Sequence, residues 1–325
     1  MNNDERYRVN KAAMRSAFDK AADSYDEVAL LQREVASRLD ERLQLVKISP
    51  QVILDLGVGT GFSCELLGKR YPQAQLLVMD ISEAMLMRAK SRQGLQQRLQ
   101  VVCGDMEYLP LASDSIDLIH SSLTLQWCSD PELAFAEFAR VLKPAGLVMF
   151  TTFGPDTLQE LRISWSRADA HVHVNAFMDM HDIGDALMRN GLGEPVMDVE
   201  HIVMTYKDVH GLMMDLKALG ASNANSGRAR SLTGKGRLQK MLQSYEEFRH
   251  DGRLPATYEV IYGHAWGRQA MATPLSEASS SMMHRRQAMS VEFEQYQRIK
   301  KQLEDDRAGD DGPEDVGPND IGTES

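Results

Sequence analysis

The chain has 325 residues, 43% of them hydrophobic, which is enough to bury the core of one large α/β domain or of two small ones. Its formal net charge is −11, but residues 304–325 hold nine acidic residues against one arginine, so residues 1–303 carry only about −3. This balance argues against broad binding to nucleic acid, which needs a positive surface, and no run approaches the roughly 20 apolar residues that span a bilayer.

Residues 10–45 predict a helical lead-in before the first strand. Apolar side chains recur there at steps of three and four residues, as in Val28, Leu31, Val35 and Leu39. We expect this stretch to form a pair of helices.

The next segment alternates short apolar runs with helical patterns. Strands that alternate with short helices predict βαβ units and a mostly parallel sheet. The expected strands are 52–56, 76–79, 99–102, 116–121 and 146–152, and the expected helices are 62–70, 83–91 and 132–142.

After residue 153 the pattern becomes mainly helical, and we predict a doubly wound, Rossmann-like α/β fold. It combines a mostly parallel seven-stranded sheet with the helical lead-in and an inserted helical cap. One domain is expected over residues 1–268, with its core at about 48–153 and the cap at about 154–250, followed by a charged, largely disordered acidic tail at 269–325. The helices are expected at 158–167, 179–190, 209–219 and 236–249, and the strands at 195–204 and 257–266.

A glycine-rich turn follows the first expected strand. Asp55 lies near the end of this strand, and Gly57, Gly59 and Gly61 follow at alternate positions. Glycine lets a backbone turn sharply and approach a ligand without a Cβ atom in the way. A dinucleotide site instead has the spacing G-x-G-x-x-G and places a diphosphate on a helix N-terminus. The carboxylate of Asp55 would repel a diphosphate but suits the ammonium group of a methionine moiety.

Two further acids follow the next two strands. Asp80, with Ile81 after it, can accept hydrogen bonds from both hydroxyls of a ribose, and Asp105 precedes Met106. Together with the glycine turn, these residues resemble the cofactor motifs of the class I methyltransferases. The resemblance implies that S-adenosylmethionine binds here, with Asp105 accepting the adenine amino group and Met106 against the ring.

The segment after the fourth strand carries polar and aromatic side chains, among them Ser122, Gln126 and Trp127. Ligands of an open parallel sheet bind beyond the carboxyl ends of its strands, where the strand order reverses. We therefore expect Ser122 and Gln126 to face the methyl donor. Trp127 is open to two interpretations, a contact to the donor or ordinary packing.

More specific sequence features lie outside the cofactor motifs. They are FDKAA at 18–22, YD at 25–26, LQREVA at 31–36, LQWC at 125–128, FTTFG at 150–154, LKALGA at 216–221 and LPATYE at 254–259. Together they resemble the malonyl-acyl carrier protein O-methyltransferases of bacterial biotin synthesis, over residues 10–268. This family transfers a methyl group to the free carboxylate of a malonyl thioester, which allows the chain to be elongated toward pimeloyl thioester.

The implied reaction makes few demands on catalytic groups. A carboxylate is already ionised at pH 7, so no general base is needed, and we predict no metal ion. His171 and His173 lie two residues apart without a third ligand and are interpreted as a surface loop. The remaining work is alignment of the reacting atoms and exclusion of water.

The acceptor side has weaker candidates. Tyr25, just past the first lead-in helix, is predicted to close over the donor, with helix packing as the alternative. Arg228 is predicted to bind the substrate carboxylate, in a basic cluster that also contains Arg230, Lys235 and Arg237. With Lys217, the rest of this cluster would dock the acidic carrier protein, unless it is only a solvated surface.

Three other functions remain open on the sequence. The chain could methylate another small carboxylic acid of the aconitate type, act in respiratory-complex assembly by a different chemistry, or bind adenosylmethionine as a regulator without turnover. The three cysteines form no CxxC pair, and the N-terminus is polar rather than apolar like a signal peptide, so we expect a cytoplasmic protein.

Overall fold

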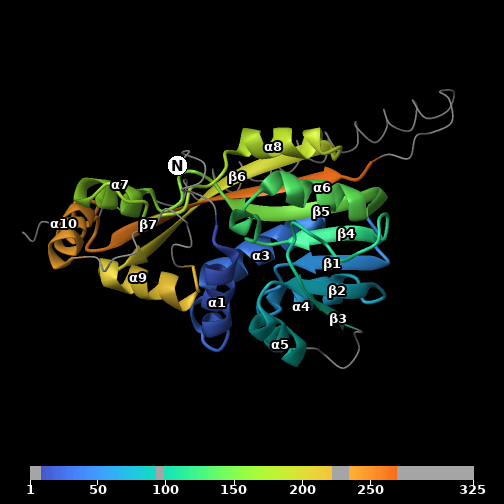
Figure 1. Ribbon diagram of the computed structural model, residues 1–325, viewed down its shortest axis with the longest axis horizontal. Coiled ribbons are helices and arrows are strands. Elements are labelled where there is room, and N and C mark those ends of the chain that lie inside the picture. The colour runs from blue at the N-terminus through green and yellow to red at the C-terminus, as the bar shows by residue number, and fades with distance from the viewer. Residues whose placement is uncertain (1–8, 93–98, 222–233, 269–325) are drawn as a thin grey trace, which may run out of the picture. The chain divides into compact units, whose positions relative to one another are not determined.

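The computed structural model describes residues 9–92, 99–221 and 234–268, which form a seven-stranded sheet flanked by helices (Figure 1). The strands are β1 (Val52–Leu56), β2 (Gln75–Asp80), β3 (Leu99–Cys103), β4 (Ile116–Ser121), β5 (Leu142–Phe153), β6 (Gly193–Tyr206) and β7 (Leu254–Trp266). The helices are α1 (Lys11–Ala21), α2 (Tyr25–Val28), α3 (Leu30–Leu43), α4 (Phe62–Arg70), α5 (Glu83–Ser91), α6 (Pro131–Val141), α7 (Gln159–Ala168), α8 (Met180–Arg189), α9 (Val209–Ala218) and α10 (Lys235–Glu246), and a 3-10 turn covers Leu125–Trp127.

The sheet has the strand order β3-β2-β1-β4-β5-β7-β6. The first five strands in this order are parallel, whereas β7 is antiparallel to both of its neighbours, β5 and β6. The chain moves outward from β1 to β3 and then returns to place β4 on the other side of β1. The order therefore reverses between β1 and β4, and the carboxyl ends of these strands border the crevice in which such sheets bind ligands.

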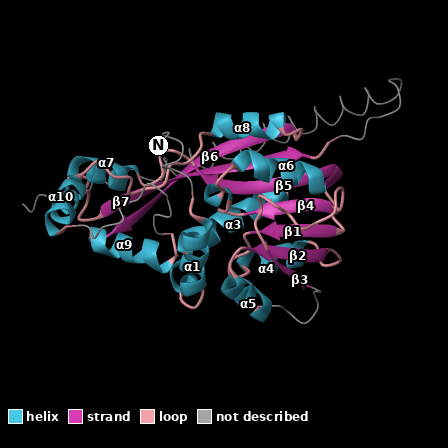
Figure 2. Ribbon diagram, in the orientation of Figure 1, coloured by secondary structure: helices cyan, strands magenta, loops and turns pink. Residues whose placement is uncertain are grey.

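Two apolar cores form because successive side chains of a strand point to opposite faces of the sheet. In β1, Ile53 belongs to the core that includes α3 and α4, whereas Leu54 belongs to the core that includes α6 and α8. Val78 and Met79 of β2 divide in the same way. Figure 2 shows the resulting layers, with cyan helices on both sides of the magenta strands.

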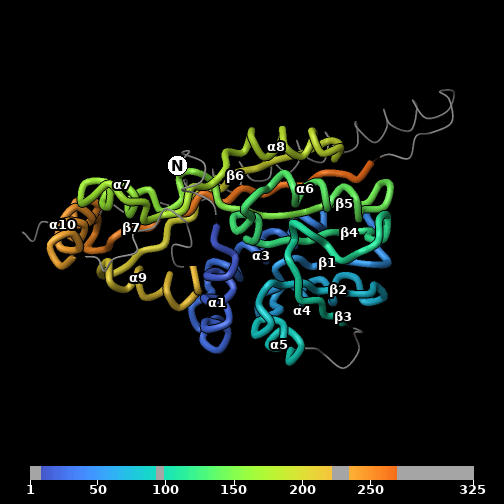
Figure 3. The backbone as a smooth tube through the Cα atoms, viewed as in Figure 1, coloured from blue at the N-terminus to red at the C-terminus, as the bar shows by residue number. Residues whose placement is uncertain are grey.

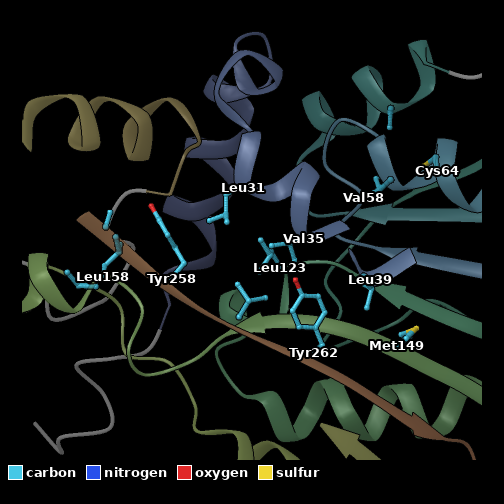
Figure 4. Close-up of a cluster of buried hydrophobic side chains, with 14 of the residues drawn as sticks. Leu31, Val35, Leu39, Val58, Cys64, Leu123, Met149, Leu158, Tyr258 and Tyr262 are labelled. Carbon is cyan, nitrogen blue, oxygen red and sulfur yellow. The ribbon is translucent and has the colours of Figure 1, made fainter. Parts of the chain in front are cut away.

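Helix α3 attaches the lead-in to the sheet. Its Leu31, Val35 and Leu39 recur every four residues and lie in one core with Leu123 and Met149 (Figure 4). Burial of such side chains stabilises the fold by about 1.5–3 kcal/mol each. The lead-in also contacts other elements at α1, which packs against α5, and at α2, which packs against α9.

Strands β6 and β7 continue past the end of β5. Strand β5 pairs with β7 as far as Phe153 and Val260, but β6 and β7 stay paired as far as Tyr206 and Leu254. Helices α7 and α10 pack together on this two-stranded extension, and α9 contacts β6 (Figure 1). The helices predicted as a cap therefore stand on strands that belong to the central sheet.

The predicted fold class is confirmed, with three differences in detail. The lead-in contains three helices rather than two, because the backbone leaves the helical region at Ala29, where ψ is 43°. The expected cap segment also includes α8, which packs against β6 and α6 as part of the sheet's own helical layer. Strand β5 begins four residues earlier than expected, at Leu142.

Two sequence predictions are not tested by these elements. Residues 269–325, the expected acidic tail, lie outside the described residues, and the division of the chain into domains stays a prediction. Over the described residues, no helix is long and apolar enough to cross a bilayer.

Candidate active site

A cavity lies at the carboxyl ends of the parallel strands, and three parts of the chain form its walls. The loops after β1 to β4 form one wall, the lead-in helices form another, and the residues at the end of α9 form a third. The predicted site residues among its lining are Tyr25, Gly57, Gly59, Asp80, Ile81, Asp105, Met106, Ser122 and Gln126.

All three glycines of the turn have positive φ, but a Cβ atom would meet different surroundings at each of them. A Cβ on Gly57 would lie 2.1 Å from the Thr124 side chain, and a Cβ on Gly61 would lie 2.9 Å from the backbone of Ala89 in α5. A Cβ on Gly59 would have no atom within 4 Å. Gly61 thus allows α4 to pack against α5 and does not line the cavity, whereas Gly59 leaves open space for a ligand.

Asp55 is not among the residues that line the cavity, and its role toward the cofactor stays a prediction. Its side chain lies behind the glycine turn with the residue only 1% exposed. Its Oδ1 is 2.9 Å from Nδ1 of His120, and its Oδ2 accepts a hydrogen bond from Cys64 Sγ at 3.8 Å. Asp55 and His120 are paired in register on β1 and β4, so their side chains lie on the same face of the sheet.

Asp80 is the buried acid of the cavity. Its two oxygens accept hydrogen bonds from the backbone N–H groups of Gly59 at 2.9 Å and Ser82 at 2.8 Å. Burial raises the pKa of Asp80 to about 6, against the lowering effect of these two hydrogen bonds. Each oxygen retains a lone pair, so the carboxylate can still accept two hydroxyl groups.

Asp105 forms an ion pair with a lysine that was not predicted as a site residue from the sequence. Lys11 Nζ lies 2.9 Å from Asp105 Oδ1 and 3.1 Å from Glu107 Oε1, and it also lines the cavity. Burial alone would lower the pKa of Lys11, but the hydrogen bond to Asp105 and the nearby negative charges raise it overall. Lys11 therefore stays charged at the end of the cavity that Asp105 and Met106 line.

The lead-in is bonded to three of the loops that carry predicted cofactor residues. Besides the Lys11 pair, Ser82 Oγ donates to Asp19 of α1 at 2.6 Å, and Thr60 Oγ1 donates to Asp26 of α2 at 2.6 Å. These bonds link α1 and α2 to the loops after β1, β2 and β3. Figure 3 shows how the chain of α1 lies beside these loops and beside the end of α9.

Aromatic side chains of the lead-in and of the loop after β4 also line the cavity. Phe18 of α1 meets Trp127 edge to face, with ring centroids 5.2 Å apart. Tyr25 begins α2, and burial together with the charges of Asp80 and Asp26 raises the pKa of its phenol, which stays protonated at neutral pH. Trp127 therefore packs against Phe18 and also lines the cavity, and its contact to the donor stays a prediction.

The loop after β4 holds its polar side chains in place. Gln126 Nε2 donates to the carbonyl oxygen of Leu123 at 2.6 Å, and its Oε1 accepts from Thr152 at 3.3 Å. Ser122 Oγ lies 3.4 Å from Thr151 Oγ1. These contacts fix the side chains of Ser122 and Gln126 at the cavity wall.

The cap reaches the cavity through the end of α9. Leu219 and Ala221 line it, and Gly220 between them has φ +69°. A Cβ on Gly220 would lie 3.1 Å from the carbonyl oxygen of Ala17, so glycine allows the cap and the lead-in to approach closely.

The basic and histidine candidates of the cap lie elsewhere. Arg228 and Arg230 fall outside the described residues. Arg237 Nη1 is 3.5 Å from Asp169, which also lies 2.8 Å from His173 Nε2. The His173 ring stacks on Trp165 at 3.7 Å, so its role is packing.

A possible ligand cluster for a metal ion lies apart from the cavity. Asp156, His201 and Glu259 have side-chain ligand atoms within 4.8 Å of one another, but none of the three lines the cavity. Glu259 Oε2 accepts from the backbone N–H of Asp156 at 2.7 Å, which gives this carboxylate a role in holding the turn after β5.

Two polar residues of α3 also line the cavity and were missed as site residues: Gln32 and Arg33. The signal was present in the sequence, because both belong to the LQREVA run of the lead-in. They lie three and four residues after Ala29, which lines the cavity as well. Helical spacing alone does not say which face of α3 points to the cavity.

Residues 54–150 match the methyltransferase domain family, and together with the sheet and its cavity they define the chain as a methyltransferase. A malonyl-[acyl-carrier protein] O-methyltransferase of Methylovorus sp. is 52% identical over 290 residues, covering 87% of this chain and 98% of the relative. One of Gallionella capsiferriformans is 50% identical over 264 residues, covering 79% and 91%. The chain belongs to the malonyl-[acyl-carrier protein] O-methyltransferase family.

The solved structures support the fold independently of close sequence similarity. The YcgJ protein of Bacillus subtilis has a TM-score of 0.53 at 16% identity, covering 71% of this chain and 98% of that protein. At this identity the likeness concerns the fold alone.

Proposed function

We propose that this enzyme transfers a methyl group from S-adenosylmethionine to the free carboxylate of a malonyl thioester on acyl carrier protein. The observation that carries the proposal is the 52% identity to a relative of that name across 98% of its length. The product is a neutral methyl ester. By hiding the charge, the ester allows the chain to be elongated toward the pimeloyl thioester used in biotin synthesis.

The residues of the cavity fit the proposed methyl donor. The open space beside Gly59 admits a ligand close to the backbone, and Asp80 has lone pairs for two ribose hydroxyls. Asp105 and Met106 would hold the adenine, with Ile81 beside them. S-adenosylmethionine supplies an electrophilic methyl group on a positively charged sulfur. Gly57 and Ser122 complete the proposed set of donor-binding residues.

The enzyme's own residues would contribute orientation and exclusion of water rather than proton transfer. The substrate carboxylate is ionised at neutral pH, and its oxygen forms a bond to the methyl carbon as the carbon–sulfur bond breaks. Both charges disappear in this step, so a site of low polarity favours it. Phe18, Tyr25 and Trp127 line the cavity and would provide such surroundings, and aromatic faces near a sulfonium add about 0.5–2 kcal/mol of cation–π stabilisation.

The carrier protein would bind at the cap. Lys217 of α9 and Lys235 and Arg237 at the start of α10 lie on helices of the two-stranded extension. Positive charge there would attract an acidic carrier protein and speed its association. Arg228 remains a predicted contact for the substrate carboxylate. We place the reaction in the cytoplasm, where three free cysteines suit a reducing environment.

Radiolabelled methyl transfer tests the proposed function. The enzyme is incubated with labelled S-adenosylmethionine and malonyl-acyl carrier protein, with malonyl-coenzyme A and acetyl-acyl carrier protein as the two comparisons. We expect base-labile label on malonyl thioesters and none on the acetyl thioester. The proposal fails if malonyl-acyl carrier protein receives no label. Label on aconitate instead would indicate a small-acid methyltransferase, and tight cofactor binding without transfer to any acceptor would indicate a regulator.

A further inference from the structure

One face of α3 points into the cavity. Gln32, Arg33 and Ala36 line it, together with Ala29 just before the helix, and these positions are spaced by three and four residues. The adjacent face carries Leu31, Val35 and Leu39, which are buried in the core (Figure 4). Because those leucines and valine fix the rotation of α3, Gln32 and Arg33 are held toward the cavity.

Arg33 is an arginine without an anionic partner among the described residues. No hydrogen bond or ion pair joins its side chain to any residue of 9–92, 99–221 or 234–268, and the residue is only half-exposed. The next two arginines of the same helix differ sharply. Arg38 pairs with Glu34 and Glu200, and Arg42 pairs with Asp198 and Glu200. A guanidinium held inside a cavity without a counter-ion favours a ligand that brings one.

Gln32 is a second side chain that indicates a bound ligand at this place. Its Oε1 is buried and has no hydrogen-bond partner in the described part of the chain. A buried amide oxygen without a partner costs about 1–3 kcal/mol, which a bound ligand can recover. An amide offers both donors and acceptors, so Gln32 can complete the hydrogen bonds of an acyl group held next to it.

Helix α3 meets the cavity beside other elements than the acids proposed to hold ribose and adenine. Those acids follow β2 and β3, whereas α3 contacts β5 and α4. Phe153 at the end of β5 and Leu219 after α9 also line the cavity. This part of the cavity therefore combines apolar walls with a positive charge that no described residue compensates, as a short acyl chain ending in a carboxylate requires.

We propose that Arg33, assisted by Gln32, binds the carboxylate of the malonyl group and so selects a free acid over its ester; this inference rests on the proposed function. The guanidinium can bind the two carboxylate oxygens side by side. During transfer one oxygen becomes the ester oxygen, the carboxylate charge is lost and the sulfonium becomes a thioether. Arg33 then holds the neutral product less tightly than the substrate, which favours product release.

The loss of charge during the reaction also determines how KM and kcat should respond to the removal of Arg33. Arg33 binds the ionised substrate more strongly than the transition state, in which the negative charge has already diminished. Removal of Arg33 should therefore raise KM for malonyl-acyl carrier protein by about tenfold to hundredfold without lowering kcat. A residue that only supported the fold would alter cofactor binding and stability as well.

The test compares Arg33→Ala, Arg33→Lys and the matched control Arg15→Ala, which removes an arginine from the exposed side of α1. Kinetics are combined with equilibrium binding of malonyl-acyl carrier protein and of its methyl ester, both in the presence of S-adenosylhomocysteine. We expect Arg33→Ala to weaken only the binding of the free acid, Arg33→Lys to restore part of it, and Arg15→Ala to behave like the wild type. Melting curves and S-adenosylhomocysteine affinity should be unchanged in all three variants.

Two outcomes would overturn the assignment. Equal weakening of the free acid and the methyl ester would show that Arg33 contacts another part of the carrier or its thioester. An unchanged KM for Arg33→Ala, with wild-type transfer intact, would remove Arg33 from the acceptor site while leaving the proposed function in place. Absence of transfer by the wild type would instead refute the proposed function.

Discussion

The proposed donor and acceptor ends of the cavity are built in opposite ways. At the donor end, Asp80 already accepts two backbone hydrogen bonds and Asp105 is paired with Lys11, so the polar groups are in place before any ligand arrives. At the acceptor end, Arg33 has no partner among the described residues, and the buried oxygen of Gln32 has none either. The donor end is therefore preorganised, whereas the acceptor end depends on its ligand to complete it.

This difference suits the two ligands of the proposed reaction. The cofactor is the same in every turnover, whereas the acceptor must be distinguished from ligands without a carboxylate. A preorganised donor end lowers the entropic cost of binding the same cofactor in every turnover. An unpaired positive charge discriminates, because a ligand without a carboxylate leaves it unsatisfied. The predictions below test whether the donor end is as rigid as the hydrogen bonds indicate.

The largest effect is expected from Gly57→Ala. The added methyl group would overlap the Thr124 side chain, and the residue has φ +68°, so we expect a loss of about 2–5 kcal/mol in the free energy of unfolding. Gly59→Ala should cost only about 1–2 kcal/mol, since its Cβ would meet no atom, but it should weaken cofactor binding by filling the cavity. Urea denaturation and cofactor titration measure the two quantities. Equal destabilisation by both variants would contradict this division of roles.

Asp80→Ala should lower cofactor affinity by about 1.5–3 kcal/mol, because it removes the charged acceptor for the ribose hydroxyls. Calorimetric titration with S-adenosylhomocysteine measures the loss. Glu41→Ala, on the exposed side of α3, is the matched control and should bind like the wild type. Unchanged affinity in Asp80→Ala would refute the assignment of Asp80 to the ribose.

Cofactor affinity should fall as the pH decreases through about 6. Burial raises the pKa of Asp80 to about 6, and the ionised form is the one that accepts both hydroxyl groups. Protonation therefore disfavours binding, and affinity at pH 5 should be roughly tenfold lower than at pH 7. Titrations of the wild type and of Asp80→Ala across this range test the cause, since the variant should lose the pH dependence. A dependence that persisted in the variant would assign it to another group.

Lys11→Ala should have the smallest effect. The Lys11–Asp105 pair is partly exposed, with about a quarter of each side chain accessible, so its removal should cost no more than about 1 kcal/mol of stability. Thermal melting measures this, with the exposed Lys20→Ala as control. A loss of several kcal/mol would mean that docking of the lead-in depends mainly on this one pair.

Much of the donor end could be predicted from the sequence because its signals are local. Glycine spacing, strand ends and apolar runs located Gly59, Asp80 and Asp105, and all three line the cavity. The position of Asp55 behind the turn was not predictable, because the glycine pattern does not say to which face of β1 its side chain points. Burial in the sheet, beside His120, decided that question.

The acceptor end was harder to predict because it is assembled from distant parts of the chain. Arg33 looked like an ordinary charged residue of an amphipathic helix, and only the packing of α3 on the sheet turns it toward the cavity. Lys11 likewise meets Asp105 across 94 residues of sequence. Side-chain chemistry suggested Arg228 for the carboxylate, a residue outside the described part of the chain.

The three bonds of the lead-in also set an order for folding during synthesis. The lead-in leaves the ribosome before the strands, but Asp26 meets Thr60 after 34 residues, Asp19 meets Ser82 after 63, and Lys11 meets Asp105 after 94. Contacts of this separation form only after the intervening chain has been made and its loop-closure entropy has been offset. Helices α1 and α2 therefore wait for the loops on which they dock, and a nascent chain that ends before β3 has a glycine turn but no closed cavity around it.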